Sequence, residues 1–203
     1  MTIKIGITGT IGSGKSMVGQ VLSDLGVPVL DTDMVVHRLY RQPFVVAKLC
    51  HAFGEGCRGT DAEVDRAALG QLVFSDAEKR SQLEALIHPL VRQETEAFLA
   101  RATQDDISVV AVLVPLLFEG HSENLYDEVW TVFVEPGSLL KERLRDRHPH
   151  WTEADLEARL SSQWSQAEKK AHADWVIDNS GSCEETAQQV KHRLRQLQET
   201  SVV

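Results

Sequence analysis

The residues Gly9-Thr10-Ile11-Gly12-Ser13-Gly14-Lys15-Ser16 match the pattern G-x-x-x-x-G-K-[ST], which decides the fold of this 203-residue chain. Glycines at these positions let the backbone turn so that successive N–H groups point into one concavity, which binds phosphate oxygens. The positive N-terminal end of the following helix adds to this attraction. Lys15 is placed to reach the β- and γ-phosphates of a nucleotide, and the Ser16 hydroxyl to bind Mg²⁺.

The sequence on both sides of this motif predicts a strand before it and a helix after it. Further short apolar or β-branched runs alternate with longer helical stretches, which is typical of a parallel, doubly wound sheet. We therefore expect an α/β fold of the P-loop NTPase type with a mainly parallel sheet. The expected strands are 3–8, 27–30, 109–114, 130–134 and 175–177, and the helix after the motif is expected over 16–25.

About 75 residues without a strand pattern separate the second and third expected strands. Ser75 and Glu78 have the spacing of a capping box, which predicts a helix that runs to about Ile87. Pro89 suits the first turn of a second helix, with His88 as the residue before it. This block is interpreted as a helical insertion in the α/β core.

A second insertion is expected over residues 139–170, and its charge differs from that of the rest of the chain. It holds seven basic and six acidic residues, so its net charge is +1 while the remainder carries −10. The whole chain has a net charge of −9, which argues against a general nucleic-acid binder. A nucleotide can still bind, because loop dipoles, Lys15 and Mg²⁺ act at short range, whereas net charge is screened within about 8 to 10 Å.

Other classes of protein are disfavoured by what the sequence lacks. No apolar run approaches the ~20 residues that span a bilayer, and the start of the chain does not resemble a signal peptide. Cys50, Cys57 and Cys183 have no C-x-x-C spacing, which favours free thiols in a reducing cytosol over disulfides or a zinc site. We therefore expect a cytoplasmic protein with no membrane or nucleic-acid partner.

Two acids, Asp31 and Asp33, follow the second expected strand. Residues two apart in an extended chain point to the same side, so both are expected to face the phosphate loop from the end of the neighbouring strand. One carboxylate there can accept a proton from a substrate hydroxyl, and the other can hold a Mg²⁺-bound water. The alternatives are that Asp31 is a turn or capping residue and that Asp33 caps the next helix. Glu119 is the first acid after the strand at 109–114, which leaves the second Mg²⁺ contact unassigned.

The chain resembles the dephospho-coenzyme A kinase family over nearly its full length. The resemblance rests on an ordered set of segments: the motif with Gly6-Ile7-Thr8 before it, Asp31-Thr32-Asp33, Asp65-Arg66 with Leu69 and Phe74, His88-Pro89, Pro115-Leu116-Leu117-Phe118-Glu119, Arg143 with Arg147, Arg159 with Gln163, Lys169, and Ala173-Asp174 to Val176-Ile177-Asp178-Asn179. It implies phosphorylation of the ribose 3′-hydroxyl of dephospho-coenzyme A by ATP, the last step of coenzyme A synthesis. Met17 stands where Thr is common in the family, and residues 148–151 look slightly longer than the usual lid turn.

The resemblance also implies a division into parts. A nucleotide-binding core is expected over 1–34, 101–138 and 171–203, a helical dephospho-coenzyme A-binding domain over 35–100, and a lid over 139–170. Within these parts Asp33 is implied to be the catalytic base, which also touches the substrate. The residues implied to cradle the ATP phosphates are Gly12, Ser13, Gly14, Lys15, Ser16 and Met17.

The remaining candidate site residues are each open to a second interpretation. Arg143 and Arg147 share a helix face and can stabilise the transferring phosphoryl group, or they belong to a solvated, salt-bridged helix. Arg66 and His88 are candidates for substrate binding, and Asn179 for a position near adenine; alternatively, His88 is a capping or core residue and Asn179 a turn residue. The expected metal contacts are Ser16 and Asp31.

The sequence thus predicts an ATP- and Mg²⁺-dependent kinase acting on dephospho-coenzyme A, as a monomer or weak homo-oligomer. Lys15, Asp33 and Arg143 are its expected catalytic residues. One alternative is another kinase of this fold, acting on a nucleoside monophosphate or a small hydroxy acid. A second is a nucleotide-binding regulatory module, which would need the N-K-x-D motif that this sequence lacks.

Overall fold

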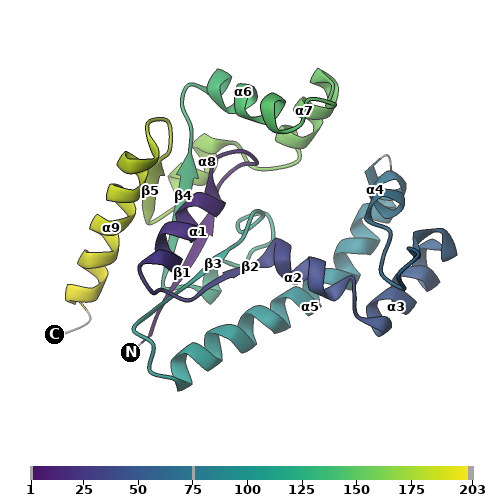
Figure 1. The fold of residues 1–203 in the computed structure, drawn as a ribbon, viewed down its shortest axis with the longest axis horizontal. Helices are drawn as coiled ribbons and strands as arrows, with labels where there is room; N and C mark the ends of the chain where they lie inside the picture. Colours follow the sequence, from purple (N-terminus) through teal and green to yellow (C-terminus); the bar gives the residue numbers. More distant parts are fainter. Residues whose placement is uncertain (1, 75, 201–203) are drawn as a thin grey trace. The chain divides into compact units, whose positions relative to one another are not determined.

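The computed structural model describes residues 2–74 and 76–200, which form two compact units. One unit combines the chain up to Asp31 with the chain from Leu99 onward, and the other comprises Thr32–Phe98. The first unit contains the sheet, and the second is helical (Figure 1). The separate lid over 139–170 and the exact limits of the expected domains stay predictions.

A five-stranded parallel sheet forms the centre of the first unit, with the strand order β2-β3-β1-β4-β5. This confirms the predicted α/β, P-loop type of fold. The strand before the motif lies in the middle of the sheet, between β3 and β4. The strands are β1 (Ile3–Thr8), β2 (Val29–Asp31), β3 (Val109–Leu113), β4 (Glu128–Phe133) and β5 (Trp175–Asp178).

Helices connect these strands and continue beyond the last one. Those of the first unit are α1 (Lys15–Asp24), η2 (Glu123–Leu125), α6 (Gly137–Arg147), α7 (Glu153–Ser161), α8 (Gln166–His172) and α9 (Cys183–Thr200). Three of them begin at a capping box that is readable in the sequence, where a Ser or Thr side chain and an acid three residues later bond each other's backbone N–H groups. The pairs are Thr152 with Asp155, Ser165 with Glu168, and Ser182 with Glu185.

The main core lies where α1 and α9 pack against one face of the sheet (Figure 1). Val190, Leu194 and Leu197 recur at helical spacing on α9 and are buried beside Val18 and Leu22 of α1. Every residue of β3 is buried, which explains its uninterrupted apolar sequence. This packing fixes the end of β1, from which the phosphate loop departs.

A smaller apolar cluster joins α6 and α7 to the phosphate loop itself. Leu140 and Leu144 of α6 and Leu156 of α7 are buried, and Ile11 of the loop packs against this cluster. The first part of the expected lid therefore has its own small core, and one residue of the loop contributes to it.

The second unit contains no strand among its described residues, as the sequence predicted. Its helices are α2 (Thr32–Leu39), α3 (Pro43–Phe53), η1 (Glu55–Cys57), α4 (Arg66–Phe74) and the larger part of α5 (Ala77–Gln104), which continues into the first unit. The prediction of two helices meeting at His88 and Pro89 is wrong, because α5 runs through Pro89 without a break. Pro89 is exposed, and an exposed position leaves room for the local bend that a proline ring requires.

The predicted capping box before α5 falls partly on Ser75, which lies outside the described residues. Asp76 is the residue seen to cap this helix, because its Oδ1 atom accepts hydrogen bonds from the backbone N–H groups of Glu78 and Lys79 at 3.0 and 3.1 Å. Cys50 and Cys57 are buried in this unit with their sulfur atoms 3.5 Å apart, and Cys183 is exposed in the other unit; all three are free.

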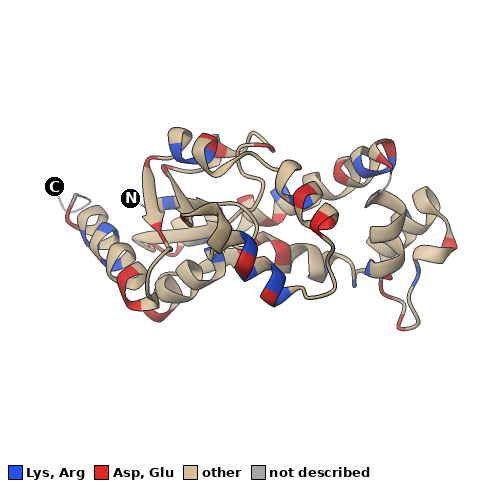
Figure 2. Cartoon of the chain, turned by 90° about the horizontal axis from the view of Figure 1, so that it is seen from above, with Lys and Arg blue, Asp and Glu red and all other residues tan. Residues whose placement is uncertain are grey.

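Acidic and basic residues are mixed along the helices rather than gathered on one of them (Figure 2). Among the described residues, no helix combines the length and apolar character needed to cross a membrane.

Candidate active site

The phosphate loop requires glycine at two positions for different reasons. Gly12 has a φ of +82°, and a Cβ atom there would lie 2.8 Å from Cδ2 of Leu144 on α6. Gly14 has a φ of +102°, and a Cβ atom there would lie 2.0 Å from Nδ2 of Asn179. Both φ values lie in the left-handed region that favours glycine. The motif glycines therefore serve the backbone turn and the close fit of neighbouring elements together.

Several polar groups of the loop are arranged as a phosphate site requires. Thr10 and Ser13 have buried hydroxyl oxygens without a hydrogen-bond partner among the described residues. Buried polar atoms are normally satisfied, so two unsatisfied hydroxyls in one short loop distinguish it from ordinary core structure. The Lys15 ammonium donates to the carbonyl oxygens of Gly9 at 2.7 Å and Thr10 at 3.1 Å, which holds it at the loop.

Asn179 follows β5 and links the loop to two other elements. Its Nδ2 donates to the Ser13 carbonyl at 2.8 Å, and its Oδ1 accepts from the Thr186 hydroxyl at 2.9 Å. The Asn179 carbonyl accepts from Nη1 of Arg143 at 3.0 Å. The structure thus brings together three residues that the sequence singled out, and Arg143 is held at the carboxyl end of the sheet, where ligands of α/β proteins bind.

Arg147, one turn after Arg143 on α6, is exposed. The helix is followed by an aromatic stack in which the ring centres of His148 and Trp151 lie 3.8 Å apart. The guanidinium of Arg159, on α7, lies 4.2 Å from the centre of the Trp151 ring. Burial, followed by the positive charges of Arg147, His150 and Arg159, lowers the pKa of His148. Arg147, His150 and Arg159 therefore lie close enough to His148 for their positive charges to act on it.

The expected metal contacts are oxygen donors, which Mg²⁺ prefers. Ser16 lies in the first turn of α1 with its side chain exposed, and Asp31 is the half-buried last residue of β2. Among the described residues no cluster of three or more His, Cys, Asp or Glu side chains exists. This donor set fits Mg²⁺, which commonly uses one or two protein oxygens together with phosphates and water.

The expected placement of Asp31 and Asp33 needs two corrections. β3 lies between β2 and β1, so the acids do not follow the strand next to the phosphate loop. The chain is extended only to Asp31, since α2 begins at Thr32, and the two-residue repeat of an extended chain does not apply to this pair. Asp33 is exposed in the first turn of α2.

The candidate substrate residues of the helical unit lie on two different helices. Arg66 is the exposed first residue of α4, whose N-terminus is capped by Asp65 Oδ1 through the N–H groups of Ala67 and Ala68, both at 3.0 Å. Burial raises the pKa of Tyr40, and the positive charge of Arg66 acts in the opposite direction. His88 is exposed in the middle of α5, so the expected positive helix end beside it does not exist.

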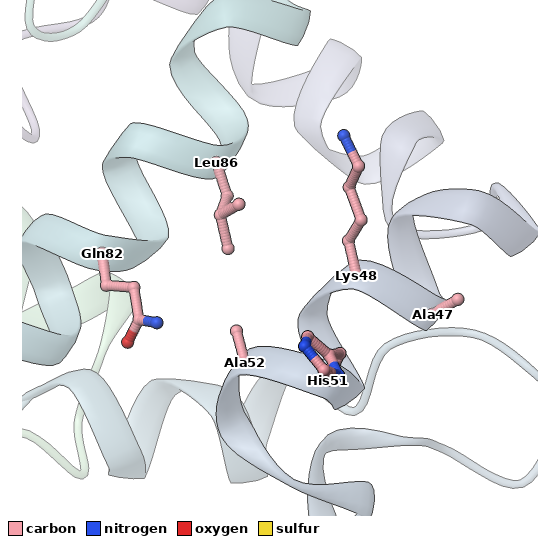
Figure 3. Close-up of a pocket in the computed structure, with 6 residues that line it drawn as sticks. All are labelled: Ala47, Lys48, His51, Ala52, Gln82 and Leu86. Carbon is pink, nitrogen blue, oxygen red and sulfur yellow. The ribbon is translucent and has the colours of Figure 1, made fainter.

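The helical unit also has an open pocket of about 610 Å³ between α3 and α5. Its lining is mainly apolar, and Leu86 and Ala52 point toward one another across it (Figure 3). The polar lining residues are Lys48, His51 and Gln82.

Sequence reasoning gave no role to three residues that bind around the loop. Gln163 accepts from the backbone N–H of Ile11 through Oε1 at 2.9 Å. Glu119 is not available as the missing acidic metal contact, because it pairs with the buried Lys169 at 2.8 Å. The two residues are 50 positions apart, so no local pattern reveals the pair.

The parallel sheet, the phosphate loop and the arginine of α6 define the class of P-loop kinases. A family model described as dephospho-CoA kinase matches residues 3–185. The chain belongs to the dephospho-CoA kinase family.

Individual relatives agree with this assignment. The dephospho-CoA kinase of Geobacillus kaustophilus is 39% identical over 197 residues, which cover 97% of each chain. Among solved structures, TT1252 from Thermus thermophilus has a TM-score of 0.81 and 36% identity, covering 97% of this chain and 98% of its own. The dephospho-CoA kinase from Campylobacter jejuni shares the fold with a TM-score of 0.68 at 24% identity, covering 97% of both chains.

Proposed function

We propose that this chain transfers the γ-phosphoryl group of ATP to the ribose 3′-hydroxyl of dephospho-coenzyme A, giving coenzyme A and ADP. The observation that carries the proposal is the phosphate loop, with positive φ at Gly12 and Gly14 and the Lys15 ammonium held at the Gly9 carbonyl, in a chain matched by the family model over residues 3–185. The likeness extends over 97% of the chain and of a relative of that name, which favours the whole reaction over nucleotide binding alone.

In this proposal the 3′-oxygen attacks the γ-phosphorus, the bond to the departing ADP oxygen breaks, and Asp33 accepts the hydroxyl proton. Gly12–Met17 bind the ATP phosphates through backbone N–H groups, and Lys15 and Arg143 neutralise charge on the transferring group. Asn179 and Arg147 complete the ATP site. Arg66 and His88 bind the anionic substrate. Asp33 touches the substrate as well, since it receives the proton.

Ser16 and Asp31 would hold Mg²⁺, which when bound neutralises negative charge on the β- and γ-phosphates. We extend the proposal to a helical substrate domain over 35–100 and a lid over 139–170. A closing lid excludes water and so prevents hydrolysis of ATP. We further propose that the protein is a monomer or weak homo-oligomer without a nucleic-acid partner. A cytoplasmic location agrees with its three free cysteines.

The test supplies ATP and Mg²⁺ with dephospho-coenzyme A, with several nucleoside monophosphates or hydroxy acids, or with no acceptor, and measures ADP and product. We expect coenzyme A and ADP in equal amounts with the first acceptor. ADP formation at the no-acceptor level with dephospho-coenzyme A would refute the proposal. Faster turnover of another acceptor would instead favour a different kinase of this fold.

A further inference from the structure

A lysine that is completely buried lies behind the phosphate loop. The side chain of Lys169, on α8, has 0% exposure, and that of its ion-pair partner Glu119 has 16%. The Lys169 ammonium also donates to the Pro115 carbonyl at 3.1 Å and to the Thr8 hydroxyl at 3.5 Å. Burial lowers the pKa of this ammonium, and the hydrogen bond and charge of Glu119 act in the opposite direction.

Such a pair is a poor source of stability. Removing two charges from water costs several kcal/mol per ion, and well-packed apolar replacements are often as stable or more so. A buried pair can instead specify one geometry among several. The contacts of Lys169 and Glu119 show which parts of the molecule this pair holds in place.

Two chains of contacts lead from the pair to the phosphate loop. In the first, Lys169 bonds Thr8, the residue directly before Gly9, and the Thr8 hydroxyl donates to Pro115 at 3.2 Å. Gly9 in turn offers its carbonyl to the Lys15 ammonium. This chain therefore reaches the start of the loop and its lysine.

In the second chain, Oε1 of Glu119 accepts from the backbone N–H of Trp164 at 2.7 Å. Trp164 directly follows Gln163, whose side chain binds the Ile11 N–H in the middle of the loop. Stacking of Phe118 on Trp164, with ring centres 5.5 Å apart, supports the same attachment. The C-terminal end of the expected lid is thus attached to Glu119 through Trp164, and to the phosphate loop through Gln163.

We propose that Lys169 and Glu119 are positioning residues of the phosphoryl transfer, which fix the phosphate loop at Thr8 and Ile11 and anchor the lid end at Trp164. This inference rests on the proposed function. It differs from a purely stabilising role in one consequence: when the pair is removed, a folded enzyme remains, but the lid end and the loop are less well aligned. Water then competes with the substrate hydroxyl for the γ-phosphoryl group, forming ADP and inorganic phosphate.

The test is the double variant Lys169→Met with Glu119→Gln, which removes both charges while keeping side-chain length. Its matched control is Arg193→Met with Glu128→Gln, since that pair has side-chain exposures of 21% and 14% and joins α9 to β4. For each protein we would measure kcat, the urea midpoint and the amount of coenzyme A formed per ADP. We expect kcat to fall at least about tenfold in the test variant, and coenzyme A per ADP to fall below about one half.

A smaller folded fraction would lower kcat but leave coenzyme A per ADP at the wild-type value, and that result would overturn the inference. So would a test variant within about threefold of its control. If the double variant does not fold, Thr8→Val and Gln163→Leu each cut one chain of contacts, and an unchanged product ratio in both would equally overturn it. Wild-type protein that forms no coenzyme A would refute the proposed function itself.

Discussion

Single residues around the phosphate loop are fitted closely enough that small changes matter. A Cβ atom on Gly14 would overlap Nδ2 of Asn179, and the same amide nitrogen binds the Ser13 carbonyl. Asn179 is only 6% exposed and fully engaged with Ser13 and Thr186. The Asn179 side chain therefore supports the phosphate loop by joining the Ser13 carbonyl to Thr186 of α9.

The role proposed for Asp33 leads to a specific prediction. Asp33→Asn keeps the size of the side chain but removes the carboxylate that receives the proton, so we expect kcat to fall by about 100-fold or more. The affinity for ATP should stay within about twofold, because the phosphate-binding groups are unchanged. Steady-state kinetics and titration with a fluorescent ATP analogue measure the two quantities. Asp61→Asn, an exposed acid of the same unit, is the control, and a kcat of Asp33→Asn equal to that of the control would exclude Asp33 as the base.

The residues that sequence reasoning located belong to local patterns, and those that it missed depend on distant contacts. The loop and its flanking elements follow from eight consecutive residues. Ser13 and Asn179 are 166 positions apart, and their contact depends on the order β1-β4-β5 in the sheet. The expectation that the strand ending at Asp31 lies next to β1 is wrong for the same reason, since strand order is not encoded within either strand.

At the scale of elements, α5 shows how tertiary packing overrides a local rule. Pro89 is a typical first-turn residue, and on propensity alone it ends the preceding helix. In the structure the apolar residues Ile87 and Leu99 are buried on either side of it, while Pro89 faces solvent. Burial of apolar residues on both sides of Pro89 therefore outweighs the one lost hydrogen bond. The starts of α7, α8 and α9 were not predicted, although each helix begins at a capping box whose spacing the sequence carries.

The segment that joins α6 to α7 should respond to acid. The pKa of His148 is lowered, so the unfolded or detached segment binds a proton at a higher pH than the packed one does. The stabilising contribution of His148 is therefore complete above about pH 6.5 and is lost as pH falls below that value. Protonation places a further charge beside Arg147, His150 and Arg159. Hydrogen exchange of residues 145–160 should accelerate, relative to the rest of the chain, between pH 7.5 and 5.5 after correction for intrinsic rates.

His148→Gln is the matched variant for this experiment, because it keeps a polar side chain that does not titrate. Its segment should show no extra acceleration at pH 5.5. Equal acceleration in wild type and variant would mean that another group controls the acid response.

For the whole molecule, the net charge of −9 is less informative than where charge lies. Segment 139–170 carries +1 and includes Arg143, while the phosphate loop attracts anions through backbone N–H groups that no charge count includes. A protein with a negative net charge can thus bind anions, because basic side chains and backbone N–H groups attract them at short range.

The stability of the whole chain should decrease in alkali because of one buried thiol. Cys57 lies in the helical unit, where burial and the neighbouring Cys50 thiol raise its pKa to about 11 from an ordinary value of 9.0. The unfolded chain then loses this proton first, so stability is complete below about pH 9 and decreases as pH rises to about 11. Over that window wild type should lose at most about 2 kcal/mol more than Cys57→Ser, whose hydroxyl does not titrate. Urea unfolding followed by far-UV circular dichroism at pH 8.5 and pH 11 measures the difference, and parallel losses in both proteins would show that Cys57 stays protonated or titrates equally in both states.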